Sequence, residues 1–131
     1  GSQCVVVAIE IMRSGISNWE PLTMCGRQHS SLDALDWAKR VVELGAGELF
    51  VTVIQNEGSK SGFDFDFVDQ IMDKVNVPVI LHGGAGNPND VVEAAKRGLS
   101  GVAIASILHY GLSTIDKIKM ELDNAGIKIR L

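Results

Sequence analysis

The sequence has few cysteines, no long apolar run and little positive charge, so it lacks the patterns of disulfide frameworks, membrane spans and nucleic-acid surfaces. Its 131 residues include two cysteines. Cys4 falls in a predicted strand and Cys25 in a predicted turn, and neither metal-ligand spacing nor a disulfide framework surrounds them, so both are expected to be free thiols. No apolar run reaches the roughly 18 residues that a transmembrane helix needs, and the chain does not open with the pattern of a signal peptide. These absences predict a cytoplasmic protein with no membrane partner and no metal site.

Positive charge is also scarce. Lys and Arg total 12 against 16 Asp and Glu, which gives a formal net charge of −4, so no general attraction to nucleic acid is expected. Any affinity for anions must be local and must come from backbone N–H groups and helix ends. The hydrophobic fraction of 46% and the charged fraction of 21% are typical of a soluble globular protein, and the length predicts one domain over residues 1–131.

The segment Val77–Asp90 is a short apolar run that breaks into glycines and then into a helix start. The three glycines of Gly83–Gly86 allow positive φ and let N–H groups approach an anion with no Cβ in the way. Asn87 or Asn89 can cap the following helix, whose positive dipole end then points at the same place. This pattern indicates a phosphate loop, although a glycine-rich turn after a strand can equally be only a turn.

A second predicted strand, Val102–Ser106, also ends in small residues before a helix. Two neighbouring strand ends of this kind can share one phosphate. In α/β barrels the phosphate site is often built from the loops after the seventh and eighth strands. The pair of strand ends therefore favours phosphate binding over a bare turn.

Strands and helices alternate four times along the chain. The expected strands cover about residues 3–11, 48–54, 77–81 and 102–106, and the expected helices about 32–44, 64–74, 88–97 and 113–125, with a small hairpin at 19–24. The β-branched first strand is typical of a strand buried on both faces. Serines 30 and 31 are expected to introduce the first helix, and Asp64 or Asp66 the second. The alternation predicts right-handed parallel βαβ units.

Four such units cannot close a barrel of eight strands. Either they form an arc that a partner or a second copy completes, or they rearrange into an open sheet with helices on both sides. We favour the arc, half of a TIM (β/α)8 barrel, whose apolar inner face and two unpaired edges would form an association surface. This predicts a homodimer or a higher homo-oligomer.

An ordered set of motifs resembles the C-terminal half of the cyclase subunit (HisF-like) of imidazole glycerol phosphate synthase, a lyase of histidine biosynthesis. The motifs are Val5–Ile9, Glu43–Glu48, Gly58–Asp64, Gly83–Gly86 and Ala103–Ser106. The resemblance runs through essentially the whole chain. It implies a barrel that takes ammonia from a glutaminase subunit and converts PRFAR into imidazole glycerol phosphate and AICAR, with no cofactor.

The resemblance also implies where a phosphorylated small molecule binds. The matching positions are Gly58, Ser59, Gly83, Gly84, Ala105 and Ser106, with Thr52, Gln55 and Glu57 in the substrate loop. Where the family usually has Asp-Arg-Asp-Gly-Thr, this chain has Gln55–Ser59, so two acids become one and the arginine is lost. His82 stands where the family tends to place a small residue, and it is expected to narrow the phosphate turn as a packed or hydrogen-bonded side chain.

The family uses two aspartates as general acid and base, and the resemblance implies that this chain carries one of the two positions. That position is Glu10, which keeps a carboxylate but moves it one methylene further out; it is either a weaker acid/base or a strand-end acid that caps a neighbouring group. Three functions stay open. They are a cyclase-type domain that is inactive alone (or a relative of the barrels of surface-sugar amidination), a non-catalytic phosphate-binding half-barrel, and an association module.

Overall fold

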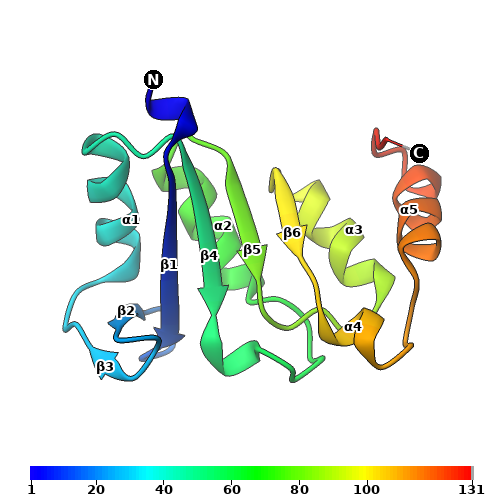
Figure 1. The fold of residues 1–131 in the computed structure, drawn as a ribbon, viewed down its shortest axis with the longest axis horizontal. Helices are drawn as coiled ribbons and strands as arrows, with labels where there is room; N and C mark the ends of the chain where they lie inside the picture. Colours follow the sequence, from blue (N-terminus) through cyan, green and yellow to red (C-terminus); the bar gives the residue numbers. More distant parts are fainter. Residues whose placement is uncertain (131) are drawn as a thin grey trace.

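Six strands form one sheet in the order β3-β2-β1-β4-β5-β6 in the computed structural model, which describes residues 1–130 (Figure 1). The strands are β1 (Val6–Arg13), β2 (Trp19–Thr23), β3 (Gln28–His29), β4 (Glu48–Val53), β5 (Val79–His82) and β6 (Gly101–Ala103). The helices are α1 (Ala34–Glu43), α2 (Phe65–Lys74), α3 (Pro88–Lys96), α4 (Ser106–His109) and α5 (Ile115–Asn124), with 3-10 turns η1 (Ser2–Cys4) and η2 (Ile54–Asn56). The strands β1, β4, β5 and β6 are parallel, which confirms the predicted alternation of strands and helices.

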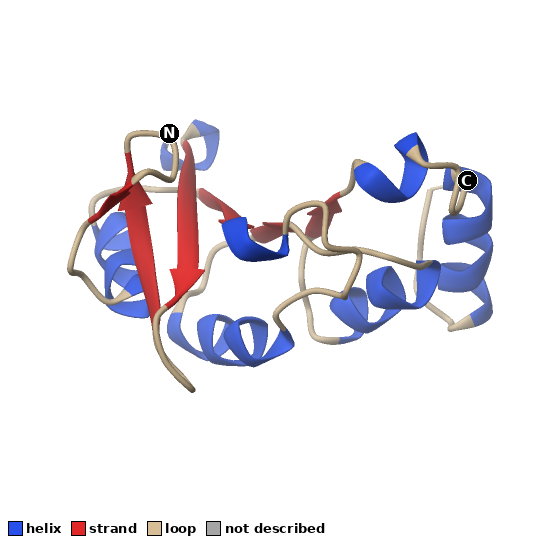
Figure 2. Cartoon of the chain, turned by 90° about the horizontal axis from the view of Figure 1, so that it is seen from below, coloured by secondary structure: helices blue, strands red, loops and turns tan. Residues whose placement is uncertain are grey.

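The helices cover one face of the parallel strands. Seen from below, α2 and α3 lie on the same side of the sheet (Figure 2), and α5 packs against α3. This is the arrangement of one half of an α/β barrel, in which helices form the outer layer and the other strand face points inward. The structure therefore agrees with the arc and not with an open sheet that has helices on both sides.

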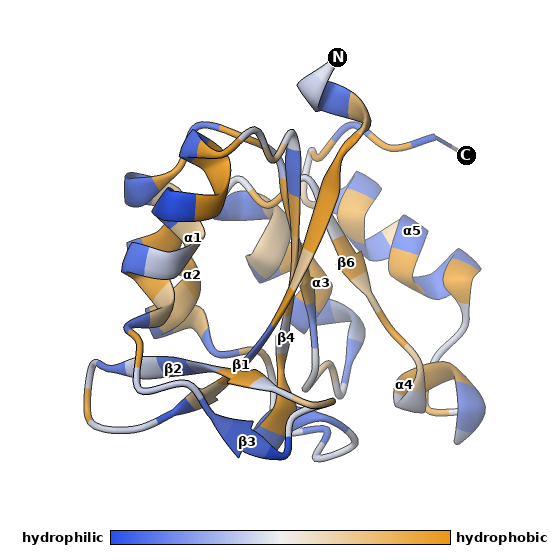
Figure 3. Cartoon of the chain, turned by 60° about the vertical axis from the view of Figure 1, so that its left-hand side comes forward, coloured by the Kyte–Doolittle hydropathy of each residue, from blue (hydrophilic) through white to orange (hydrophobic). Residues whose placement is uncertain are grey.

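Burial alternates along each strand. Ile9 and Ile11 of β1 are buried beneath the helices, as are Leu49 and Val51 of β4. Val6, on the opposite face of β1, is 53% exposed, and Figure 3 shows β1 as a hydrophobic strand at the front of the molecule. The prediction that β1 is buried on both faces was wrong, because no second layer covers the inner face within residues 1–130.

The inner face has an apolar row and a polar row that follow from the strand register. Ala8, Phe50 and Ile80 lie side by side across β1, β4 and β5. Two residues further along, Glu10 pairs with Thr52 and Thr52 with His82. We call Glu10, Thr52 and His82 the polar row; it lies towards the carboxyl ends of the strands.

Short polar side chains fix the helix starts. Asp33 caps α1 by accepting bonds from the N–H groups of Leu35 and Asp36, each at 2.9 Å, so the helix begins after Asp33 and not at the serines expected to introduce it. Asp64 caps α2. Asn87 caps α3 in a capping box, with Pro88 at the first helical position. The helices before and after the glycine-rich turn are thus held by local chemistry.

Two segments differ from their predicted structure. Cys4 lies in η1 and not in a strand, because the pairing of β1 with β4 begins only at Val6 and Glu48. The last strand ends at Ala103, and Ser106–His109 forms the short helix α4, so Ala105 and Ser106 do not belong to a strand. Both cysteines are exposed and free, as expected.

The hairpin partly fills one edge of the sheet. β2 pairs antiparallel with the end of β1, from Ile11 opposite Pro21 to Arg13 opposite Trp19. Trp19 is almost fully buried, and its ring meets Phe67 of α2 edge-on at 5.3 Å between centroids. The expectation of two unpaired edges was therefore wrong for the carboxyl end of β1, while within residues 1–130 no strand pairs with the first half of β1 on that side.

Candidate functional site

Three loops meet at the carboxyl ends of the parallel strands and enclose a small pocket. The loops follow β4, β5 and β6, along the lower edge of the molecule in Figure 1. The cavity measures about 90 Å³ and is lined by Glu57, Gly58, His82, Gly83, Gly84, Ala85, Ala103, Ile104, Ala105 and Ser106. Whole small molecules usually occupy pockets of about 300 Å³ or more. A cavity of this size suits an ion or one terminal group of a ligand.

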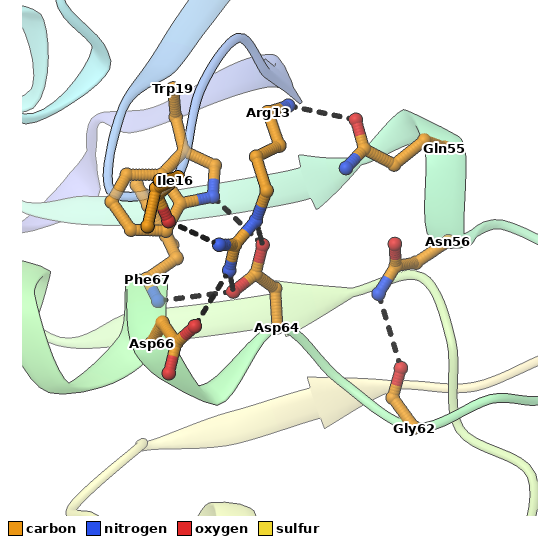
Figure 4. Close-up of polar contacts among 9 residues, drawn as sticks. All are labelled: Arg13, Ile16, Trp19, Gln55, Asn56, Gly62, Asp64, Asp66 and Phe67. Atoms are coloured by element: carbon orange, nitrogen blue, oxygen red, sulfur yellow. Dashed lines mark hydrogen bonds and ion pairs between the residues drawn. The ribbon is translucent and has the colours of Figure 1, made fainter.

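Glycine is required where the first two loops touch. Gly83 and Gly84 have φ of +100° and +117°, and a Cβ on Gly84 would lie 2.1 Å from the carbonyl oxygen of Gly62. A backbone hydrogen bond joins the two loops at that point, because the N–H of Gly62 donates to the Gly84 carbonyl at 2.8 Å. The Asn56 side chain donates to the Gly62 carbonyl at 3.2 Å (Figure 4). The glycines thus let one loop seat against the other.

Backbone N–H groups without partners supply the chemistry of the pocket. Within residues 1–130, the N–H groups of Gly84, Ala105 and Ser106 donate to no other group. Ser106 begins α4, so its N–H has no acceptor within that helix. Gly58 closes the other side, since a Cβ on it would lie 3.9 Å from the Ser106 hydroxyl oxygen. Such amides can hydrogen-bond an oxyanion.

The structure brings together five of the six residues predicted to bind phosphate. Gly58, Gly83, Gly84, Ala105 and Ser106 all line the pocket. Ser59 lies beside the pocket without lining it: its hydroxyl donates to the Asn56 carbonyl at 2.8 Å and lies 2.7 Å from the Ser61 hydroxyl.

The predicted substrate-loop residues separate into two groups. Glu57 lines the pocket, and Thr52 belongs to the polar row. Gln55 is turned towards β1, where its side-chain oxygen accepts the backbone N–H of Arg13 at 2.7 Å (Figure 4). In this conformation Gln55 ties η2 to the end of β1.

Glu10 lies in the polar row but outside the phosphate pocket. It lines a groove of about 400 Å³ between β1, the hairpin and α1. Its carboxylate makes no hydrogen bond or ion pair within residues 1–130, so it does not cap a neighbouring group.

His82 is packed and hydrogen-bonded, as expected, and it also lines the pocket. Its Nδ1 lies 3.4 Å from the Thr52 hydroxyl and 3.6 Å from a carboxylate oxygen of Glu57. Its ring packs beside the Phe50 ring, with 6.1 Å between the ring centroids. The link to Glu57 was missed from the sequence; the position of His82 at the end of a strand beside the glycines was the available signal.

An ion pair with a buried carboxylate lies near the site, and no sequence pattern revealed it. Asp64 accepts two bonds from Arg13 and one from Trp19 Nε1 at 2.8 Å (Figure 4). Burial raises the pKa of Asp64, but the hydrogen bonds from Arg13, Trp19 and the Phe67 N–H outweigh it and lower the pKa below the ordinary value. The cluster fixes the end of β1 and the hairpin to the start of α2.

The fold and the pocket define half of an α/β barrel with an amide-lined cavity at the carboxyl ends of its strands. Comparison with known proteins gives the family. A family model described as "Histidine biosynthesis protein" matches residues 1–114, and the chain belongs to this family. The resemblance identified from the motifs is confirmed.

Curated relatives align with the whole chain. The chain is 44% identical over 131 residues to "Imidazole glycerol phosphate synthase subunit HisF" of Pyrococcus furiosus and 39% identical over 132 residues to the subunit of the same name from Bacillus cereus strain G9842. Each alignment covers 100% of this chain and 52% of the relative, so the chain spans about half the length of the curated relatives it matches. No helix within residues 1–130 combines the length and apolar character needed to cross a membrane.

Proposed function

We propose that this chain is a phosphate-binding half-barrel that corresponds to the C-terminal half of a HisF-like cyclase barrel. The observation that carries the proposal is the pocket of about 90 Å³, which is lined by three residues with unpartnered N–H groups from the loops after β5 and β6 and by Gly58 from the loop after β4. Its ligand is a phosphorylated small molecule whose phosphate enters the pocket. The rest of the ligand lies over the inner face, towards Thr52 and Glu10.

Catalysis requires more than this chain supplies. Two carboxylates on opposite sides of the substrate are expected to act as acid and base, and Glu10 is the one candidate among the residues predicted from the sequence. We therefore propose that the isolated chain binds its ligand without measurable turnover. With the rest of a barrel and a glutaminase subunit it would take part in the cyclase reaction that the names of its relatives indicate.

The inner face of the sheet is also suited to binding another protein surface. The apolar row Ala8, Phe50 and Ile80 faces away from the helices, and Val6 on the same face is about half exposed. An apolar sheet face of this kind, next to an unpaired strand edge, favours association. We propose a homodimer, or a higher homo-oligomer, as the state of the isolated chain. An association module with an idle pocket is the second candidate function, and the cytoplasmic location expected from the sequence stays a prediction.

Thermal unfolding with added phosphate tests the phosphate-binding proposal. Binding to the folded state raises the melting temperature by linkage, so millimolar phosphate should raise it above that of a sodium chloride control of equal ionic strength. In Ser106→Asp a carboxylate would occupy the pocket, and the rise should disappear. Ser100→Asp is the matched control, because Ser100 is exposed and lies outside the pocket, and it should keep the rise. An unchanged melting curve for the unmodified chain would favour the association module.

A turnover assay tests the catalytic part. The chain is given PRFAR and ammonia, and formation of imidazole glycerol phosphate is followed. We expect no rate above background. A measurable rate that Glu10→Ala abolishes would contradict the claim that the chain is inactive alone.

A further inference from the structure

The pocket contains one side chain that can carry positive charge. No Lys or Arg lines it, and among its lining residues His82 alone has a cationic form. We infer that His82 is a ligand-contacting, specificity-determining residue, whose ring donates a hydrogen bond to an oxygen of the bound phosphate group. This inference rests on the proposed phosphate binding and adds a side chain to a site otherwise made of backbone amides.

The ring is held in place by groups that engage only one of its two nitrogens. Nδ1 faces the Thr52 hydroxyl at 3.4 Å and the Glu57 carboxylate at 3.6 Å. Phe50 supports the ring from the neighbouring strand. No group within residues 1–130 makes a hydrogen bond to Nε2, so this nitrogen is available to a ligand. A carboxylate at one ring nitrogen fixes the orientation of the other, as it does in other histidine sites.

The charges around the pocket explain why phosphate binding would depend on His82. Glu57 lines the pocket and would repel a phosphate. A His82 ring that donates from both nitrogens is a cation and can lie between the two anions. The carboxylate of the polar row, Glu10, lies two strands away. Lys60, in the same loop as Glu57, is engaged elsewhere: its ammonium lies 4.1 Å from the centre of the Tyr110 ring. His82 is therefore the side chain that can offset Glu57.

The placement also predicts the class of ligand. The cavity takes one terminal group, and His82 stands between it and the open inner face. A phosphate monoester fits this arrangement, because its terminal oxygens meet the amides and His82 while its ester arm leaves along the polar row.

The three histidines of the chain allow a direct test by NMR. The ring resonances of His29, His82 and His109 are assigned in the 131-residue chain and followed as inorganic phosphate is added at constant pH and ionic strength. We expect the His82 resonances to move with the same dissociation constant as the backbone amides of Gly84 and Ser106. The rings of His29 and His109, which lie outside the pocket lining, should stay unchanged.

A pair of variants measures how much the His82 ring contributes to the affinity for phosphate. His82→Asn removes the ring but keeps a polar side chain, and the loss of a hydrogen bond to a charged group should weaken phosphate binding about tenfold or more. His109→Asn is the matched control and should bind phosphate as the unmodified chain does. Should His82→Asn fail to fold, the titration of the unmodified chain still decides the question.

The outcomes separate this inference from the proposed function. If the amides of Gly84 and Ser106 respond to phosphate while the His82 ring does not, the role of His82 is refuted and phosphate binding stands. If neither the amides nor the ring respond, phosphate binding itself fails, and the role of His82 fails with it.

Discussion

The guanidinium of Arg13 contacts the carboxylate of Asp64 at two points, with Nη2 2.6 Å from Oδ1 and Nε 3.1 Å from Oδ2. The two residues are 51 positions apart in the chain and join the end of β1 to the start of α2. The Asp64 side chain is 4% exposed. The loop that carries Glu57 and Gly58 runs from η2 to the start of α2, so the pair helps to hold the end of a loop that forms one wall of the pocket.

Removal of the Asp64 carboxylate should destabilise the fold. Asp64→Ala removes two of the acceptors of the Arg13 guanidinium, the acceptor of the Trp19 indole N–H and the cap of α2. Because only the carboxylate is buried and Arg13 is 28% exposed, we expect a loss of about 2 kcal/mol in unfolding free energy. Urea unfolding measures the change. Asp66→Ala is the matched control, because Asp66 also bonds Arg13 but is 72% exposed, and it should cost less than about 1 kcal/mol. Equal losses in the two variants would refute the role of the buried pair.

The lowered pKa of Asp64 predicts how stability depends on pH. Since the folded state holds this carboxylate at a lower pKa than the unfolded chain does, its contribution is full above the ordinary aspartate pKa of about 3.9. The contribution is lost as the pH falls below that value and through the folded-state pKa. Asp64→Asn lacks this titration. The difference in unfolding free energy between the unmodified chain and Asp64→Asn should therefore shrink as the pH is lowered from about 5 to about 2. A constant difference would contradict the assignment.

The contact between the first two loops predicts a strong effect at Gly84. Gly84→Ala would place a Cβ 2.1 Å from the Gly62 carbonyl oxygen at a φ of +117°, so the loops must separate. We expect a loss of about 3 kcal/mol in unfolding free energy together with loss of phosphate binding. Gly111→Ala is the control, because its φ is also positive but no atom lies within 4 Å of the added Cβ. It should cost about 1 kcal/mol and leave phosphate binding intact.

The parts of the structure that were predictable are those set by neighbours in the sequence. Apolar periodicity gave the four strand–helix units, and Asn87 with Pro88 gave the start of α3. The glycines and Ser106 could be assigned to one site because parallel strands bring their carboxyl ends to the same edge of the sheet. Each of these inferences needs only a short stretch of chain and one general rule.

The parts that were missed depend on residues far apart in the chain. The pairing of Arg13 with Asp64 and of His82 with Glu57 arises only when the loops are folded. The short helix α4 has too few residues to show a period, and the antiparallel pairing of β2 with β1 depends on how the hairpin folds back. Burial was misjudged for β1, because a continuous β-branched run does not reveal whether a second layer covers the inner face.

The open inner face predicts self-association. Ile80 lies on this face in register with Phe50, and Ile80→Glu would place a charge in the centre of the proposed interface. Sedimentation velocity at micromolar concentration should show a dimer or larger species for the unmodified chain and a monomer for Ile80→Glu. Met120→Glu, on an exposed position of α5, should leave the assembly unchanged. A compact monomer of the unmodified chain would refute this proposal.

The most direct test of phosphate binding is a crystal structure of this chain grown in the presence of phosphate. We predict one phosphate ion in the pocket between the three loops, within hydrogen-bonding distance of the backbone N–H groups of Gly84 and Ser106. A well-defined pocket without the ion, or with those N–H groups bonded to other parts of the chain, would contradict the account.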